Sequence, residues 1–314
     1  MASQGESSTR VQGPLITIAV PFVSGLAYLR KALDSVFLQT RSDWALVLCE
    51  NCVDPHEREA ARALLESYGD PRASFHQGSE HVSMGANFNR CIGVASTDLV
   101  TILHSDDELL PTYVETVIAI ESQHRSASML FFRAITIGSQ GQPVYSFVDS
   151  AKKMLAPRSR GAVLLIGEAG LRSLMIGNFI MAPTVCFRKS QLGAIKWSET
   201  LKFTLDLDLY CKALIAGKTI VGIRGAAQYA YRRHTGSTTA ALSQNLYRFV
   251  EESATFDAIS SSARSIGWHK AARAAERKTT LRLHLLLLAA SDLARGRFRS
   301  AASKLRLLPQ MDSR

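Results

Sequence analysis

The sequence predicts an α/β fold in which a mostly parallel sheet is flanked by helices. Short apolar segments rich in Val, Ile and Leu alternate with longer segments whose apolar residues recur at helical spacing. The clearest pair is the apolar run 15–20, followed by the helical pattern 26–38. Strands that alternate with helices indicate βαβ units, and such units place helices on both faces of a parallel sheet.

The same alternation continues along most of the chain. We expect the first strand to stop at Pro21, because proline has no N–H to donate. The other predicted strands are 45–49, 73–77, 99–103, 129–137, a proline-interrupted strand within 177–188, and 226–231 as the last strand of the core. The other predicted helices are 57–68, 86–94, 110–124 and 206–216. Beyond about residue 243 the periodicity is purely helical, so we expect a helical C-terminal extension.

Length and composition indicate one large domain with an appendage. The chain has 314 residues, of which 46% are hydrophobic and 20% charged, and this is enough to bury a full core. No apolar run approaches the roughly 20 residues that span a bilayer. Residues 1–14 lack an apolar signal core, so we expect a disordered leader on a cytoplasmic protein, a main domain at 15–240 and the extension at 241–314.

The charge distribution indicates which partners the chain could bind, and the cysteines indicate whether it has a metal or redox site. The net charge is +10, and residues 261–314 contain 12 Lys or Arg but three acidic residues. Such a segment suits nucleic acid, an anionic membrane surface or an acidic partner, or it is a solvated helical face. The five cysteines lie mostly in apolar segments and fit buried free thiols. Cys49 and Cys52 form a C-x-x-C, but no second pair at zinc spacing accompanies them.

The segment 104–107 (His-Ser-Asp-Asp) directly follows the apolar run 99–103. Adjacent carboxylates at the end of a buried strand repel each other unless a cation or solvent relieves the repulsion. Taken alone, Asp106 and Asp107 are more typical of a solvated turn than of a binding site. In parallel sheets, however, ligands bind at the carboxyl ends of the strands, where Glu50 and Asn51 also fall. We therefore expect these polar side chains to meet at one edge of the sheet.

The motifs at these strand ends, taken in order from about residue 15 to 239, resemble family 2 of the inverting nucleotide-sugar glycosyltransferases, whose fold is called GT-A. Segments 16–21 (ITIAVP) and 29–40 (LRKALDSVFLQT) are similar to the family's opening strand and helix. Segment 47–54 (VLCENCVD) is similar to the part in which a carboxylate contacts the nucleobase. The resemblance gives that place to Glu50, with Cys52 where the family usually has Ser.

Two further segments resemble the donor site of the family. Segment 85–91 (GANFNRC) is similar to its Asn-containing helix, and 103–111 (LHSDDELLP) to its acidic metal motif. The resemblance implies a divalent cation, Mn²⁺ or Mg²⁺, that bridges the diphosphate of the sugar donor. Oxygen ligands suit such hard cations, which neutralise a departing diphosphate. His104 takes the first acidic position, so Asp106 and Asp107 are the expected ligands, and which of them binds directly stays open.

Segment 201–217 resembles the part of the family that carries the catalytic base. Asp206 matches the base, Leu205 replaces the preceding Glu, and Asp208 is the alternative. Inversion at the sugar carbon requires a base on the acceptor side. A helix N-terminus keeps a carboxylate ionised, although Asp206 is also a plausible N-cap.

Segment 231–239 (YRRHTGSTT) resembles the loop that follows the last core strand of the family. The resemblance implies that its Arg residues contact the diphosphate and that His234 joins Asp106 and Asp107 at the metal. The basic segment 150–161 is either a lid or a solvated loop. The complete set of residues expected to bind the donor is Pro21, Glu50, Asp54, Asn87, Arg90, Asp106, Arg232 and Arg233.

Together these motifs imply a metal-dependent inverting glycosyltransferase with a UDP-, GDP- or dTDP-sugar as donor. The acceptor would be a hydroxyl of a polysaccharide, such as one of the cell envelope, of a lipid-linked glycan or of a small molecule, and the basic helices would contact the membrane surface. The alternative is a catalytically degenerate nucleotide-sugar-binding or scaffold protein of the same fold. Nucleotidyltransferases are disfavoured because no Gly-rich basic loop follows the first strand, and dinucleotide-dependent oxidoreductases because no G-x-G-x-x-G does. Only the basic tail suggests nucleic acid.

Overall fold

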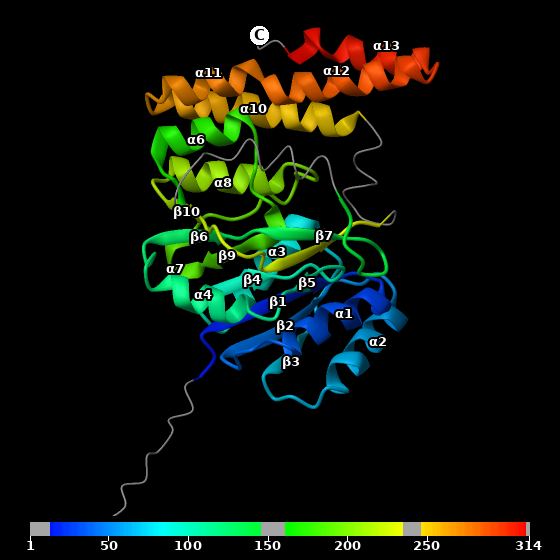
Figure 1. The fold of residues 1–314 in the computed structure, drawn as a ribbon, viewed down its shortest axis with the longest axis vertical. Coiled ribbons are helices and arrows are strands. Elements are labelled where there is room, and N and C mark those ends of the chain that lie inside the picture. Colours follow the sequence, from blue (N-terminus) through cyan, green and yellow to red (C-terminus); the bar gives the residue numbers. More distant parts are fainter. Residues whose placement is uncertain (1–12, 146–160, 235–245, 312–314) are drawn as a thin grey trace, which may run out of the picture.

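The computed structural model describes residues 13–145, 161–234 and 246–311 (Figure 1). Its strands are β1 (Ile16–Phe22), β2 (Trp44–Glu50), β3 (Ala73–His76), β4 (Leu99–Ile102), β5 (Glu108–Leu109), β6 (Ala127–Phe131), β7 (Ala134–Ile137), β8 (Val163–Leu165), β9 (Val185–Arg188), β10 (Thr219–Gly222) and β11 (Tyr229–Arg232). Its α-helices are α1 (Leu26–Phe37), α2 (Pro55–Glu66), α3 (Met84–Val94), α4 (Tyr113–Glu121), α6 (Gly167–Ile176), α7 (Lys189–Leu192), α8 (Leu205–Ile215), α10 (Tyr247–Ser265), α11 (His269–Arg277), α12 (Thr279–Ala294) and α13 (Phe298–Leu307).

The main sheet confirms the predicted fold class. It has eight strands in the order β3-β2-β1-β4-β9-β6-β10-β8, of which β3, β2, β1 and β4 are parallel neighbours. Strand β9 runs antiparallel to both β4 and β6, and β8 is antiparallel to β10. One hydrophobic cluster joins this sheet to α1, α2 and α4, and another joins it to α3, α6 and α8. The sheet is thus covered on both faces.

Pro21 does not end the first strand, contrary to the expectation. Strand β1 continues to Phe22, and Pro21 keeps its place opposite Cys49 of β2. On the other side of β1, pairing with β4 stops at Ala19. No β4 residue pairs with Pro21, so the missing N–H breaks no hydrogen bond on that side.

The predicted strands 129–137 and 226–231 are also corrected. The first is two strands, because the chain leaves the main sheet after β6 and enters a second sheet as β7. This second sheet has the order β5-β11-β7, so the predicted last core strand lies in it as β11. Elements β8, α6 and β10 were not predicted. The small sheet joins the segment after β4 to the C-terminal part of the domain.

The C-terminal residues form helices, as predicted, and these stack beyond α6 and α8 (Figure 1). Buried residues of α10 and α11, including Phe256, Ile259 and Ala272, share one hydrophobic cluster with α6 and α8. The extension is therefore packed onto the core. No helix among the described residues is long and apolar enough to cross a membrane. The expected leader lies almost wholly outside the described residues, as does nearly all of the basic segment 150–161.

Candidate active site

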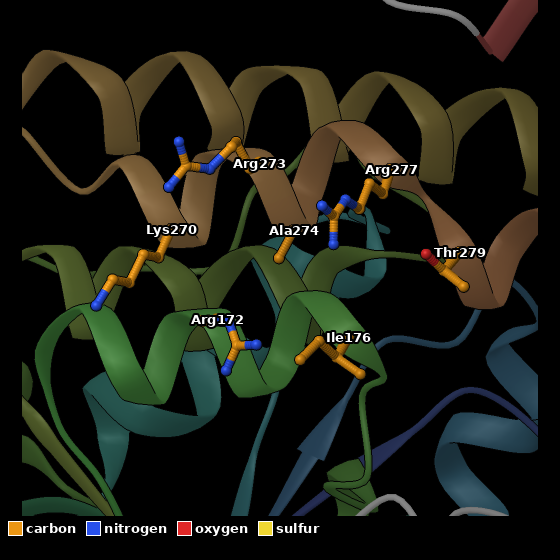
Figure 2. A pocket seen from close by; sticks show the side chains of 7 residues that line it. All are labelled: Arg172, Ile176, Lys270, Arg273, Ala274, Arg277 and Thr279. Carbon is orange, nitrogen blue, oxygen red and sulfur yellow. The ribbon is translucent and has the colours of Figure 1, made fainter.

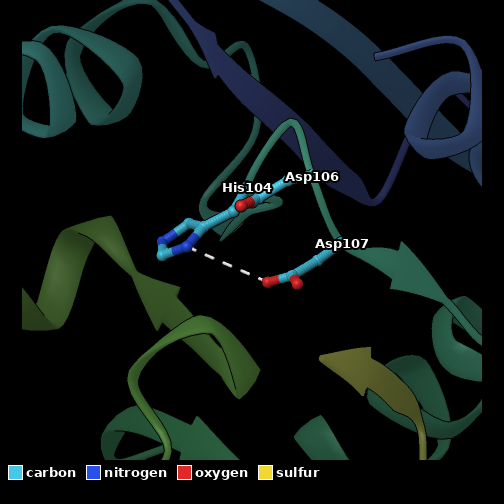
Figure 3. A group of neighbouring side chains, drawn as sticks. All are labelled: His104, Asp106 and Asp107. Carbon is cyan, nitrogen blue, oxygen red and sulfur yellow. Dashed lines mark ion pairs between the residues drawn. The ribbon is translucent and has the colours of Figure 1, made fainter. Parts of the chain in front are cut away.

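The acidic segment lies in the turn between β4 and β5. His104, Asp106 and Asp107 each offer a ligand atom, and these atoms all lie within 4.8 Å of one another. Figure 3 shows the three side chains on this turn, with His104 Nδ1 3.9 Å from Asp107 Oδ2. His104 and Asp106 are about 30% exposed, whereas Asp107 is buried. The turn therefore brings one imidazole and two carboxylates into a single group.

Asp107 is held inside the protein by two donors from β11. The hydroxyl of Tyr229 donates to Oδ2 at 3.0 Å, and the backbone N–H of Arg232 donates to Oδ1 at 2.7 Å. Burial raises the pKa of Asp107 well above its ordinary value, and the neighbouring charge of Asp106 adds to this rise. Asp107 is thus the anchored member of the pair, and Asp106 is the more accessible one.

We expected the side chain of Arg232 to be open to the diphosphate of the donor, but the structure places it in the interior. Its side chain is fully buried and forms an ion pair with Glu108. Its Nε donates to the backbone oxygen of Asp106 at 2.8 Å, and its Nη1 donates to the backbone oxygen of Gly138 at 3.0 Å. The guanidinium therefore stabilises the acidic turn from the buried side, through the backbone of Asp106 and the side chain of Glu108. We attribute the difference to the alternation of β11, which turns Arg232 inward.

His234 lies beside the acidic turn. Its Nε2 is 2.9 Å from Asp106 Oδ2, and its ring packs against the ring of Tyr28 of α1 at 4.9 Å between centroids. His234 therefore contacts the expected metal-binding carboxylate, while His104 joins the group of possible ligands itself. Arg233 continues the strand register, since its N–H donates to the backbone oxygen of Ile137 at 2.8 Å.

Glu50 occupies the end of β2, as the sequence predicted, and is buried. Its Oε1 accepts from the backbone N–H of Cys52 at 2.7 Å and lies 3.0 Å from Nε of Arg58, and its Oε2 accepts from Gly78 N–H at 3.2 Å. Arg90 of α3 donates to the backbone oxygen of Glu50 at 3.1 Å. Glu50 thus organises the loops around it as well as lying at the expected nucleobase position.

The remaining residues of the expected donor site are spread around the same edge. The side-chain amide of Asn51 forms two hydrogen bonds with the backbone of Val82. Its Nδ2 donates to the Val82 oxygen at 3.0 Å, and its Oδ1 accepts from the Val82 N–H at 2.9 Å. Asp54 caps α2 by accepting from His56 N–H at 2.9 Å. Asn87 is buried on α3, and its Oδ1 has no hydrogen-bond partner among the described residues. Asn87 therefore keeps an acceptor that a ligand can use.

Asp206 lies in the first turn of α8, where the sequence placed the candidate base. The indole Nε1 of Trp197 donates to Asp206 Oδ1 at 3.0 Å. Asp208, the rival, forms an ion pair with Lys212 one turn along the helix, with 2.5 Å between Oδ2 and Nζ. Both carboxylates are half-buried.

Phe88 of α3 links the acidic turn to the candidate base. Its ring stacks with His104 and meets Trp197 edge-on, with 5.6 Å between the centroids in each case. Asn89 fixes Trp197 by donating to its backbone oxygen at 3.0 Å and accepting from its N–H at 2.9 Å. A glycine at position 85 allows this approach, because an added Cβ would overlap the carbonyl oxygen of Ser198.

The loop before α8 is held from the C-terminal helices. Glu251 of α10 is buried and accepts backbone N–H bonds from Lys202, Phe203 and Thr204 at 2.6–2.9 Å. Burial raises the pKa of Glu251, but these hydrogen bonds outweigh it and lower the pKa below its ordinary 4.5. An ionised side chain of the extension thus places the helix that carries Asp206.

The donor set at the acidic turn fits a divalent cation. One imidazole nitrogen and two carboxylate oxygens suit Mn²⁺ or Mg²⁺. Burial raises the pKa of Asp107 most, and the charge of Asp106, which a cation would offset, raises it further. The sequence alone did not identify Tyr229, Trp197, Phe88 and Glu251 as part of this arrangement. The period-two pattern of a strand turns positions 229 and 231 to the same face, and it gives no local signal for the hydrogen bond between Tyr229 and Asp107.

The fold is similar to that of several solved structures. The structure is similar to that of a TarS fragment from S. aureus in complex with UDP-GlcNAc, with a TM-score of 0.60, 15% identity and coverage of 95% of this chain and 92% of that chain. It is also similar to the mannosyltransferase PcManGT from Pyrobaculum calidifontis in complex with GDP-Man and Mn²⁺, with a TM-score of 0.59, 13% identity and coverage of 97% and 77%. The fold is that of the GT-A glycosyltransferases.

The sequence is similar to a family model and to several relatives. Residues 17–160 match the model of glycosyl transferase family 2. An uncharacterized glycosyltransferase of Rickettsia typhi is 24% identical over 64% of this chain and 59% of its own length. The succinoglycan biosynthesis protein ExoW of Rhizobium meliloti is 24% identical over 66% and 65%. The matches cover 59% and 27% of two Rickettsia relatives, less than two thirds of either.

Proposed function

We propose that the protein is an inverting glycosyltransferase that moves a sugar from a nucleoside diphosphate to a hydroxyl acceptor. The observation that supports this best is the placement of two separate carboxylate sites on one edge of the sheet. The group of His104, Asp106 and Asp107 suits a metal-bound diphosphate. Asp206 lies across Phe88 and Trp197 from that group, as a base on the opposite side of the sugar requires.

In the proposed reaction the acceptor hydroxyl attacks the anomeric carbon of the donor sugar. The new C–O bond forms as the bond from that carbon to the diphosphate breaks, and the hydroxyl proton passes to Asp206. Trp197 holds the carboxylate through its indole N–H. We infer that Glu50 contacts the nucleobase of the donor and that Asn87 also binds the donor, and the unpartnered Oδ1 of Asn87 supports this.

The metal would be held by Asp106, with Asp107 and His104 beside it and His234 hydrogen-bonded to Asp106. When bound, such a cation supplies positive charge that stabilises the departing diphosphate. Arg232 and Tyr229 hold the turn in shape while this happens. Mn²⁺ is our first choice, because an imidazole ligand suits it better than Mg²⁺.

A donor screen tests the proposal. The full chain is incubated with UDP-, GDP- and dTDP-sugars and Mn²⁺, and the released nucleoside diphosphate is measured. We expect release with one donor class, loss of release with EDTA, and loss in Asp106→Asn. A chain that binds UDP or GDP with Mn²⁺ but releases nothing from any donor, with or without acceptors, would be the nucleotide-sugar-binding or scaffold protein instead. A chain that neither binds nor releases them would contradict both.

We further propose that residues 15–240 form the catalytic domain and that the 241–314 extension contacts an anionic membrane surface bearing the acceptor, such as a polysaccharide or lipid-linked glycan of the cell envelope. On α12 and at the start of α13, Leu283, Leu287 and Phe298 are 55%, 60% and 69% exposed among basic residues. Exposed apolar residues with cations are the pattern of interfacial helices. The five buried free cysteines support a cytoplasmic location.

Vesicle flotation tests the membrane contact. Leu283→Ser with Leu287→Ser should release the protein from vesicles that contain anionic lipid. Retained binding in this double variant would show that these leucines do not enter the membrane.

A further inference from the structure

A groove between α6 and α11 collects positive charge. It has a volume of about 460 Å³ and is lined by Arg172, Ile176, Lys270, Arg273, Ala274, Arg277 and Thr279. Figure 2 shows α11 lying over α6, with Lys270 and Arg277 reaching toward α6 and Arg172 on the opposite wall. All four cations are exposed, while Ile176 and Ala274 provide an apolar patch between them. The groove shares no residue with the candidate active site.

The two helices run in the same direction, which places their cations opposite each other. Glu168, in the first turn of α6, accepts backbone N–H bonds from Lys270 and Ala271 in the first turn of α11, at 2.5 and 3.2 Å. One turn further along α6, Arg172 faces the next turn of α11. On α11 the three cations fall at positions i, i+3 and i+7, which is one helical face about 10 Å long.

The four cations of the groove have few counter-charges. Across the residues that the structure describes, no ion pair joins any of them to a carboxylate. Glu168 is used in capping α11, and Glu276, which also feels the charge of Arg273, pairs with Arg264 of α10 at 2.5 Å. Some other cations of the extension do have partners, as Lys278 has in Asp257 and Lys304 in Asp292. Like charges across a packed helix pair are unfavourable, and a bound anion removes that cost.

We propose that the groove between α6 and α11 binds a ligand that carries several phosphate groups. Three arginines and a lysine offer many N–H donors, and guanidinium groups pair with phosphate oxygens in bidentate fashion. The row of cations on α11 is about 10 Å long, which is longer than one phosphate group. Its length matches a chain or a cluster of several phosphate groups. The phosphates come either from a soluble polyanion or from lipid headgroups. The proposal is independent of the transferase reaction.

The test uses the full chain and two matched double variants. Arg172→Gln with Arg273→Gln removes one cation from each wall of the groove. Arg295→Gln with Arg299→Gln removes the same charge from exposed positions of the extension outside the groove. Tripolyphosphate binding is measured by titration calorimetry at low salt, and the thermal unfolding midpoint of each variant confirms that it is folded.

We expect the groove variant to bind tripolyphosphate about tenfold or more weakly, and the control to bind like the wild type. In a second arm, groove-dependent flotation with vesicles of anionic phospholipid identifies a lipid source, and groove-dependent binding of tripolyphosphate alone identifies a soluble one. An equal loss in both variants would mean diffuse charge attraction and would overturn the proposal. The absence of binding in both arms would overturn it as well.

Discussion

The acidic turn and the start of α8 each hold a carboxylate of the candidate active site, but the fold secures them differently. Asp107 is buried against the small sheet, with donors from Tyr229 and Arg232. Asp206 is half-buried and is positioned by Trp197 and by a loop that Glu251 of the extension caps. The hydrogen bonds of Asp107 therefore contribute to the stability of the domain. Asp206 is placed by neighbours and contributes little to folding itself.

This difference separates two kinds of mutational effect. Substitutions around the acidic turn should change stability and activity together, since the network is buried. Substitution of Asp206 itself, or of Trp197 beside it, should change activity with the fold intact. The four substitutions below test this division, from the largest expected effect to the smallest.

Asp206→Asn is expected to lower kcat by about 10³-fold, because the acceptor hydroxyl loses its base. Binding of the nucleoside diphosphate and the unfolding midpoint should not change. Asp208→Asn is the matched control and should keep kcat within about threefold, since Asp208 is paired with Lys212. Steady-state kinetics with the preferred donor measures both. A large loss in Asp208→Asn alone would make Asp208 the base.

Arg232→Met should lower the free energy of unfolding by about 3–5 kcal/mol, because it leaves buried carbonyl groups and Glu108 without their partner. Urea unfolding followed by circular dichroism measures this. Arg233→Met, at the residue that directly follows β11, is the control and should lower the free energy of unfolding much less. A loss below about 1 kcal/mol for Arg232→Met would mean that Arg232 does not brace the turn.

Glu251→Gln should lower the free energy of unfolding by about 2 kcal/mol at pH 7, because charged acceptors bond more strongly than amides. The folded-state pKa of Glu251 lies below its ordinary 4.5, so its contribution is present above pH 4.5 and is lost as the pH falls through the folded value. The gap between wild type and variant should therefore close in acid. Glu59→Gln, an exposed site, is the control. A gap that stays constant with pH would exclude this role of the charge.

Trp197→Phe should lower kcat about five- to tenfold with little change in the donor KM, because it removes the N–H that orients Asp206 but keeps the aromatic packing on Phe88. Trp44→Phe removes a buried indole on β2 and serves as the control. Equal losses in both variants would point to general loosening of the core, and the assignment of Trp197 as a positioning residue would be wrong.

Much of the fold follows from the local pattern. The parallel half from β1 to β4 was predictable because each strand is a short apolar run between amphipathic helices. The second half was harder. The run 129–137 reads as one strand, and only tertiary pairing shows that its ends belong to two different sheets. Pro21 was read as a stop, yet its effect depends on whether a neighbour pairs on that side.

The candidate site shows the same limit. The positions of Asp106, Glu50 and Asp206 at strand or helix ends follow from sequence order, whereas their partners come from distant parts of the chain. Nothing local indicates that Trp197 points at Asp206 or that Glu251 caps the loop before α8. Arg232 shows the opposite error. We expected this basic residue to contact the diphosphate, but its side chain is buried under the acidic turn.

The bonds from β11 to the acidic turn also have a consequence for biosynthesis. Tyr229 and Arg232 reach Asp107 across 122 and 125 residues of sequence. A ribosome delivers the turn long before it delivers the strand that supports it. A nascent chain can pair β1 with β2 early, but the carboxylates at the turn reach their final arrangement only when β11 has emerged. The arrangement of the acidic turn is therefore among the last features of the domain to form, and an incomplete chain would carry the first half of the fold without a complete candidate site.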